Sequence, residues 1–133
     1  MSAQPGPRIR LAGGLLLWYG VLGGAVAWAV HLLAAWSLDE LACAAGSQHI
    51  SGVPLWQALG IAVVVPAVAT AGALLVAALV WWRTARAQAA GDADRATSRS
   101  RLLAVVGVWA NLLFLAIIVL GGVAVLVFPP CQG

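Results

Sequence analysis

The sequence predicts an all-α integral membrane protein, a bundle of three spanning helices in a single domain over residues 1–133. Two observations lead to this fold class. Hydrophobic residues make up 63% of the chain and charged residues only 8%, whereas an ordinary soluble domain carries roughly 25% charged residues. In addition, three segments of 27 or 28 residues carry no formal charge: residues 11–38, 55–82 and 102–128.

Each of these segments is long enough to cross a bilayer, because a helix needs about 20 residues to span the hydrocarbon core. Open strands are excluded, since their edge groups would have no hydrogen-bonding partners in lipid. The first segment follows Arg8 and Arg10, as a signal peptide does, but its apolar run is far longer than the usual h-region of about 7–15 residues. The loops are expected at residues 39–54 and 83–101.

The ends of the second and third helices follow from local signals. Helix two is expected to continue past Trp82 to about Ala90 and to end at Gly91, because glycine is favoured just beyond a helix. Asp92 or Ser98 is expected to cap the start of helix three. Within helix two, Pro66 is expected to produce a kink, because proline removes a backbone hydrogen bond.

The arginines predict the orientation. The chain has no lysine, and the loop assignment puts all of its arginines on one side: Arg8, Arg10, Arg83, Arg86, Arg95, Arg99 and Arg101. The other side carries Asp39 and Glu40. By the positive-inside rule, the N-terminus is cytoplasmic and the C-terminus extracytoplasmic. The prediction is a multi-pass protein of the bacterial inner membrane, whose basic charge serves orientation and implies no nucleic-acid partner.

The two cysteines, Cys43 and Cys131, both fall on the extracytoplasmic side of this topology. A disulfide between them is expected, because that compartment is oxidising. It would close a loop of nearly ninety residues and stabilise the fold by roughly 4 kcal/mol in the chain-entropy picture. A copper or zinc site with His49 as third ligand and a pair of free thiols are the alternatives.

His31 is the one ionisable residue within the three apolar segments. Such residues are functional candidates by default. The expected role is that of a neutral histidine bonded to a helix backbone or to a neighbouring subunit, with Trp28 beside it on the same face. The alternatives are that His31 contacts a quinone or takes part in proton transfer, or that it provides one ligand to a haem shared with another subunit. With no second histidine at membrane depth, the chain alone is expected to bind no cofactor.

Asn111 is the polar residue of helix three, and it is expected to find an interhelical partner. At a similar depth lie Gly20 in helix one and Thr70 and Gly72 in helix two. Gly20 and Gly24 form a GxxxG step, a spacing that lets helix backbones approach closely. These residues are expected to hold the helices together. Asn111, Trp28 and His31 are also candidates for contact with a partner subunit or lipid.

Several short motifs resemble a known family. They are Ala27-Trp28-Ala29-Val30-His31, Leu41-Ala42-Cys43, Ser100-Arg101-Leu102-Leu103-Ala104 and Phe128-Pro129-Pro130-Cys131. The pattern is similar to that of small three-span proteins found in bacteria alongside haem-copper cytochrome c oxidases of the aa3 type. The resemblance implies an accessory subunit or assembly partner of such an oxidase, with no redox role for these residues.

Composition leaves two function classes. Few groups for chemistry remain in the chain, so neither an independent enzyme nor catalytic residues are expected. The first class is an accessory subunit of a respiratory complex, a cytochrome c oxidase above all or else a photosynthetic or other electron-transport assembly, with membrane subunits and lipids as partners. The second is an independent protein: an assembly or metal-delivery factor, or a small transporter protomer. Co-purification of this chain with haem-containing subunits would distinguish the two classes, because only an accessory subunit is expected to be recovered with them.

Overall fold

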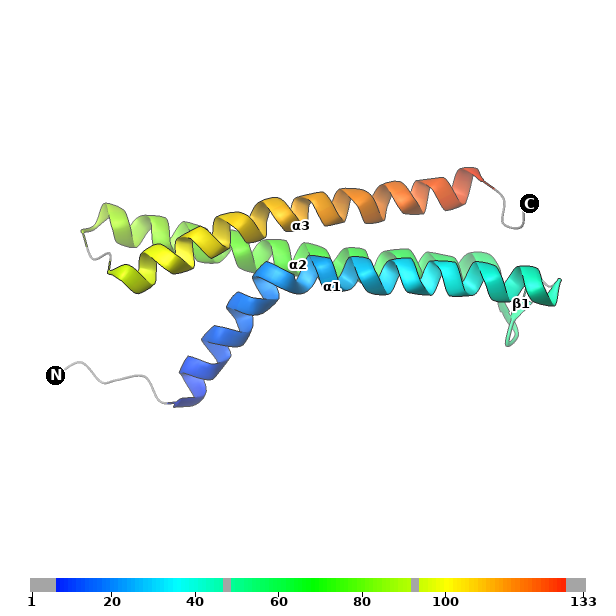
Figure 1. Cartoon of the computed structure of the whole chain (residues 1–133), viewed down its shortest axis with the longest axis horizontal. Helices are drawn as coiled ribbons and strands as arrows, with labels where there is room; N and C mark the ends of the chain where they lie inside the picture. The colour runs from blue at the N-terminus through cyan, green and yellow to red at the C-terminus, as the bar shows by residue number, and fades with distance from the viewer. Residues whose placement is uncertain (1–6, 47–48, 92–93, 129–133) are drawn as a thin grey trace.

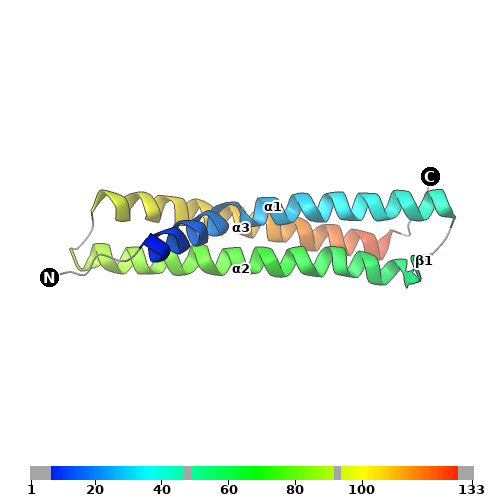
Figure 2. The same ribbon diagram turned by 90° about the horizontal axis from the view of Figure 1, so that it is seen from below.

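The computed structural model describes residues 7–46, 49–91 and 94–128. In this part of the chain, three long helices and one small hairpin follow each other as α1 (Pro7–Ala45), β1 (His49–Ile50), β2 (Val53–Pro54), α2 (Leu55–Ala89) and α3 (Arg95–Val127). The helices lie side by side as an up-down-up bundle (Figures 1 and 2), and every pair of them is in contact. The predicted all-α, three-helix fold is confirmed.

All three helices are long and apolar enough to cross a membrane. The qualifying stretches are Gly13–Ala45, Leu55–Ala89 and Arg95–Val125. These lengths exceed the roughly 20 residues that a spanning helix needs. The fold is therefore that of a multi-pass membrane protein. Which end faces the cytoplasm is still a prediction from the arginines.

Helices α1 and α3 are longer than predicted, because their ends extend through polar residues. Helix α1 continues to Ala45, and α3 begins at Arg95 instead of residue 102. The expected caps of α3, Asp92 and Ser98, were wrong. Asp94 is the N-cap, and its carboxylate accepts a hydrogen bond of 2.8 Å from the backbone N–H of Thr97. Such a bond satisfies one of the free N–H groups at a helix start.

Helix α2 ends close to the predicted place. Ala90 is its C-cap, and its N–H bonds to the carbonyl of Arg86. Gly91 follows with a φ of 80° and donates its N–H to the carbonyl of Gln88. This left-handed conformation is the reason why a glycine stands there.

The connection between α1 and α2 contains a tight hairpin that the sequence analysis treated only as loop. Ile50 pairs with Val53, and the two residues between them, Ser51 and Gly52, have φ values of 51° and 84°. Two consecutive positive φ angles are typical of a type I′ turn, whose twist fits a two-residue hairpin. The turn brings the chain directly into α2 at Leu55.

Each helix buries one narrow stripe of mostly small residues. Its members are Gly20, Gly24, Ala27, His31 and Ala42 of α1; Leu55, Leu59, Ala62, Pro66, Thr70, Ala73 and Ala77 of α2; and Ala104, Gly107, Asn111, Ile118 and Gly122 of α3. Most of these steps are three or four residues, the spacing of helices that pack at shallow angles. Lipid does not drive apolar side chains together, so small residues at close contacts hold such bundles.

Helix α1 is bent. Its first part, residues 7–19, which we call the arm, leaves the direction of the bundle (Figure 1). Among residues 13–45 of α1, Gly20 is the first that is buried. Helix α2, where Pro66 was expected to cause a kink, shows no sharp bend in either view (Figures 1 and 2). The bend therefore lies in α1 and not, as expected, at Pro66 of α2.

Candidate functional site

The polar groups inside the bundle form the candidate site, and Asn111 of α3 makes most of its bonds. Its side chain is fully buried. The amide Nδ2 donates to the carbonyl of Gly20 at 2.6 Å and to that of Gly107 at 2.7 Å. The amide Oδ1 accepts from the N–H of Gly24 at 2.8 Å. Asn111 therefore holds α3 against the backbone of α1 by both halves of its amide.

These bonds account for the bend in α1. Gly20 and Gly24 are four residues apart, so their C=O and N–H are the pair that a regular α-helix joins to each other. Asn111 bonds both members of that pair. A side chain that enters the backbone ladder in this way is one of the few causes of a sharp bend in a helix. The arm leaves the bundle on the N-terminal side of this point (Figure 1).

Glycine is required where Asn111 meets α1. A Cβ on Gly24 would overlap the Asn111 amide, and a Cβ on Gly107 would lie 2.6 Å from the carbonyl oxygen of Gly20. Thr70 of α2, also fully buried, lies beside Gly24 and donates its hydroxyl to the Pro66 carbonyl at 2.8 Å. The structure therefore brings together Asn111, Gly20 and Thr70, three of the residues that the sequence placed at one depth, with Gly24 one turn further along α1.

His31 bonds to the carbonyl that Pro66 leaves without a helical donor. In a regular helix, the C=O of Ala62 would accept from the N–H of residue 66, but proline has no N–H. The His31 Nδ1 lies 2.8 Å from that carbonyl oxygen, and since a carbonyl can only accept, Nδ1 carries the proton. A Cβ placed on Gly121 of α3 would be 3.1 Å from Nε2. His31 thus completes the hydrogen bonding of α2 from α1.

These positions correct one expectation. His31 is 6% exposed and Asn111 is 0% exposed, so both side chains lie inside the bundle and not on its outer faces. The amide of Asn111 and the Nδ1 of His31 are bonded within the chain, because polar groups need partners at membrane depth. Trp28 is half-buried, and its ring packs on that of Phe114 of α3 with 5.7 Å between the centroids. Trp28 keeps a partly accessible face.

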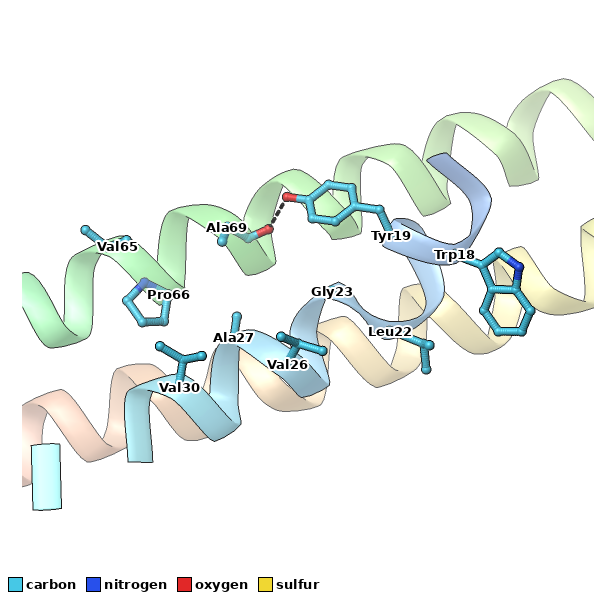
Figure 3. A pocket seen from close by; sticks show the side chains of 10 residues that line it. All are labelled: Trp18, Tyr19, Leu22, Gly23, Val26, Ala27, Val30, Val65, Pro66 and Ala69. Atoms are coloured by element: carbon cyan, nitrogen blue, oxygen red, sulfur yellow. Dashed lines mark hydrogen bonds between the residues drawn. The ribbon is translucent and has the colours of Figure 1, made fainter. Parts of the chain in front are cut away.

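Tyr19 makes a contact between α1 and α2 that was not expected from the sequence. Its hydroxyl donates to the carbonyl of Ala69 on α2 at 2.6 Å, and Figure 3 shows the ring reaching across between the two helices. Gly72 makes room for it, since a Cβ there would lie 2.8 Å from the hydroxyl oxygen. The sequence did contain a signal for this contact. Tyr19 directly precedes a glycine-rich turn of helix one, and glycine and alanine lie at a similar depth in helix two.

An apolar groove of about 380 Å³ lies between α1 and α2 beside this bond (Figure 3). Its lining residues are Trp18, Tyr19, Leu22, Gly23, Val26, Ala27, Val30, Val65, Pro66 and Ala69. Two of these side chains carry a polar group, the hydroxyl of Tyr19 and the indole N–H of Trp18. The hydroxyl is already bonded to the carbonyl of Ala69. The groove therefore presents a hydrocarbon surface and no acid, base or nucleophile.

The predicted disulfide involves Cys131, which lies outside the described residues, so the pairing stays a prediction. Cys43 lies on the last turn of α1, with its Sγ 3.8 Å from Oδ1 of Asp39. His49, the third residue of the alternative metal site, begins β1. Within the described ranges, no group of three or more His, Cys, Asp or Glu side chains gathers as a metal site would require.

The arginine-bearing end of the bundle contains a second set of contacts. The guanidinium of Arg86 lies over the Trp82 ring, 3.8 Å from its centroid, and Arg101 donates to the side chain of Gln88. The hydrogen bonds from the backbone and hydroxyl of Thr97 lower the pKa of Asp94 below its ordinary value, because they favour the charged carboxylate. Of these contacts, the bond between Arg101 and Gln88 joins α3 to α2.

Comparisons with known proteins show no relatives. No family model matches the chain, and neither a curated protein nor a solved structure matches it.

Proposed function

We propose that this chain is a non-catalytic accessory subunit of a respiratory membrane complex, a cytochrome c oxidase of the haem-copper type. The family resemblance of the sequence motifs supplies the name of the complex. The structural role is supported by one observation: the polar side chains within the spans bond to other helices of the same chain. His31, Asn111 and Tyr19 each bond to the backbone of another helix, so the groups that would otherwise suggest transport or catalysis hold the bundle together.

The outward faces support the same proposal. Large apolar side chains stand exposed along all three helices; examples are Trp18 (60%), Val68 (67%) and Trp109 (71%). In a membrane, such faces meet lipid or the helices of other subunits. A thin bundle that fixes its own geometry internally and exposes three apolar faces is suited to packing against larger subunits.

The proposal includes an orientation in the membrane and a disulfide bond. The arginine-bearing end faces the bacterial cytoplasm, by the positive-inside rule. The outer end, where α1 meets α2, carries the Cys43–Cys131 disulfide. There, Ala42, Leu55 and Leu59 form a buried cluster with Leu38, Ile50 and Val125 packed around it. The disulfide would tie the C-terminal tail to this cluster and present a fixed outer surface to a neighbouring subunit.

Affinity purification tests the proposal. The tagged chain is extracted from its native host in a mild detergent, and the eluate is examined by absorbance spectroscopy and mass spectrometry, with an untagged strain as control. We expect haem absorbance and large oxidase subunits in the tagged eluate alone. Recovery of the 13.6 kDa chain by itself, with no haem band, would contradict the proposal and favour an independent membrane protein.

A further inference from the structure

The start of α3 has a concave surface that the proposed function does not use. It has a volume of about 600 Å³ and is lined by Arg95, Ala96, Arg99 and Ser100. Arg95 and Arg99 are four residues apart, so they lie on the same side of the helix. The surface therefore combines two guanidinium groups with one hydroxyl.

These two arginines differ from others at the same end of the bundle. Arg86 lies against the Trp82 ring and Arg101 bonds to Gln88. Among the described residues, no carboxylate pairs with Arg95 or Arg99; the nearest in sequence, Asp94, holds Thr97 through both its backbone N–H and its hydroxyl. Two exposed guanidinium groups of this kind attract an anion, and phosphate suits their planar donors.

The bend in α1 leaves the Ser100 side of this surface uncovered. Gly107 of α3 contacts Gly20 of α1, and Ser100, seven residues before Gly107, lies on the same side of α3 two turns nearer the arginine-bearing end. If α1 continued straight, its first turns would run along that side. Instead the arm diverges from α3 (Figure 1).

The depth of Arg99 matches a lipid headgroup. The apolar run of α3 begins at Leu102. At 1.5 Å per residue, Arg99 lies about 4.5 Å and Arg95 about 10 Å beyond it along the helix axis. The polar layer on each side of a bilayer is roughly 5–8 Å thick, so Arg99 lies at the level of the phosphates and Arg95 lies just beyond that layer.

An apolar strip continues from the arginines into the membrane. Leu102, Val106 and Trp109 follow Arg95 and Arg99 at alternating steps of three and four residues, and they are 67%, 51% and 71% exposed. Residues at such steps form one stripe along a helix. A bound molecule with a phosphate at the arginines would therefore have hydrocarbon contact below it on the same helix.

We infer that Arg95, Arg99 and Ser100 form a binding site for the headgroup of an anionic phospholipid, whose acyl chain lies along Leu102, Val106 and Trp109. The choice of a lipid follows from the charge of the site, its depth and the apolar strip together. This inference does not depend on which complex the chain joins. It requires only that α3 spans a membrane.

Native mass spectrometry of the full chain in detergent tests the site. The purified protein is titrated with phosphatidylglycerol and, separately, with phosphatidylcholine of the same acyl chains. We expect the anionic lipid to bind the wild-type chain more tightly. An arginine near an anionic headgroup contributes about five-fold to affinity, so Arg99→Gln should weaken phosphatidylglycerol binding about five-fold and the Arg95→Gln/Arg99→Gln pair roughly 30-fold. Circular dichroism confirms that each variant keeps its helices.

Arg83→Gln is the matched control, because it removes one positive charge from the same end but from α2, outside the concave surface. It should change binding less than two-fold. An equal loss in Arg83→Gln and Arg99→Gln would show a general effect of charge and overturn the site. So would equal binding of the two lipids, or displacement of the lipid by millimolar inorganic phosphate, since a free anion cannot replace the acyl contact.

Discussion

At the scale of single residues, His31 and Pro66 act as a pair from different helices. Proline leaves the Ala62 carbonyl of α2 without a helical donor, and the Nδ1 of His31 on α1 lies 2.8 Å from it. A buried carbonyl with no donor costs free energy in a membrane. The histidine therefore allows α2 to pass through Pro66 as one helix.

This pairing predicts a coupling between the two residues. His31→Ala should destabilise the bundle by about 1 kcal/mol or more, since a buried acceptor loses its donor. In a Pro66→Ala background, residue 66 supplies its own N–H, so His31→Ala should cost clearly less. The measurement is a double-mutant cycle of unfolding free energies in mixed micelles. Tyr19→Phe is the control, because its bond to Ala69 is independent of residue 66 and the two effects should add; equal coupling in both cycles would contradict the pairing.

Asn111 gives a second prediction at this scale. Replacing it with leucine removes two bonds to α1. Interhelical hydrogen bonds in membranes are worth about 0.6–1.7 kcal/mol each, so we expect a loss of about 1–3 kcal/mol. The Gly24 N–H and Gly20 C=O would then be free to bond to each other, and the arm should move toward α3.

Spin labels at Leu16 and Leu102, both exposed, would follow this movement by pulsed electron paramagnetic resonance. The distance between the labels should shorten in Asn111→Leu. Gln57→Leu, which removes an exposed amide at the start of α2, should leave it unchanged. An unaltered distance in Asn111→Leu would show that the bend has another cause.

At the scale of elements, the contact between α1 and α3 depends on a close approach of two backbones. A Cβ on Gly107 would lie 2.6 Å from the Gly20 carbonyl oxygen and 3.3 Å from the Cβ of Ala77. Contacts of this kind force the helices apart, and overpacking costs about 1–3 kcal/mol. Gly107→Ala should lower stability by this amount in a detergent unfolding assay.

Gly60→Ala is the matched comparison, because Gly60 lies in α2 with nothing within 4 Å of its added Cβ. Alanine favours helix over glycine by about 1 kcal/mol, so this variant should be neutral or slightly more stable. Equal changes in stability for Gly107→Ala and Gly60→Ala would show that the close approach of the two backbones does not hold α1 and α3 together.

The start of α3 predicts a dependence on pH. Hydrogen bonds from Thr97 lower the pKa of Asp94 in the folded chain. A lowered carboxyl pKa contributes stability that is fully present above the unfolded pKa, and this contribution is lost as the pH falls through the folded value. Hydrogen exchange at the Thr97 amide should therefore accelerate at low pH relative to neighbouring amides. Asp94→Asn keeps a capping oxygen but cannot titrate, so its protection should not change with pH over this range.

The long helices followed from the sequence because apolar length and charge placement determine them directly. The end of α2 near Gly91 also followed from the sequence, but the start of α3 did not, because Arg95 and Thr97 were expected in a loop and Asp94 caps a turn outside the apolar run. Residue counting from the helix ends predicted that Asn111 and Gly20 lie at a similar depth, and the structure joins them by a hydrogen bond. The same arithmetic would have paired His31, about 12 Å below Asp39, with Ala62, about 10.5 Å beyond Leu55. The bend in α1 could not be predicted, because it depends on which backbone groups the Asn111 amide reaches.

At the scale of the whole molecule, the start of α1 and the end of α3 lie at opposite ends of the bundle (Figure 1). The orientation proposed from the arginines puts the α2–α3 connection in the cytoplasm. A cysteine introduced as Ala90→Cys, at the exposed end of α2, should react with a membrane-impermeant thiol reagent only after the cells are opened. Ser51→Cys, in the turn of the hairpin, should react in intact cells. The reverse pattern would invert the topology and remove the case for an extracytoplasmic disulfide.

The central claim is that this chain is a structural subunit whose intramembrane polar residues hold its own helices and ligate nothing. The most direct test is the absorbance spectrum of the complex purified through a tagged His31→Gln chain, compared with the tagged wild type. Glutamine retains an N–H donor for the Ala62 carbonyl, so the account predicts the same haem bands at the same ratio to protein. A haem band present with the wild type and lost with His31→Gln would make His31 a ligand and contradict the claim.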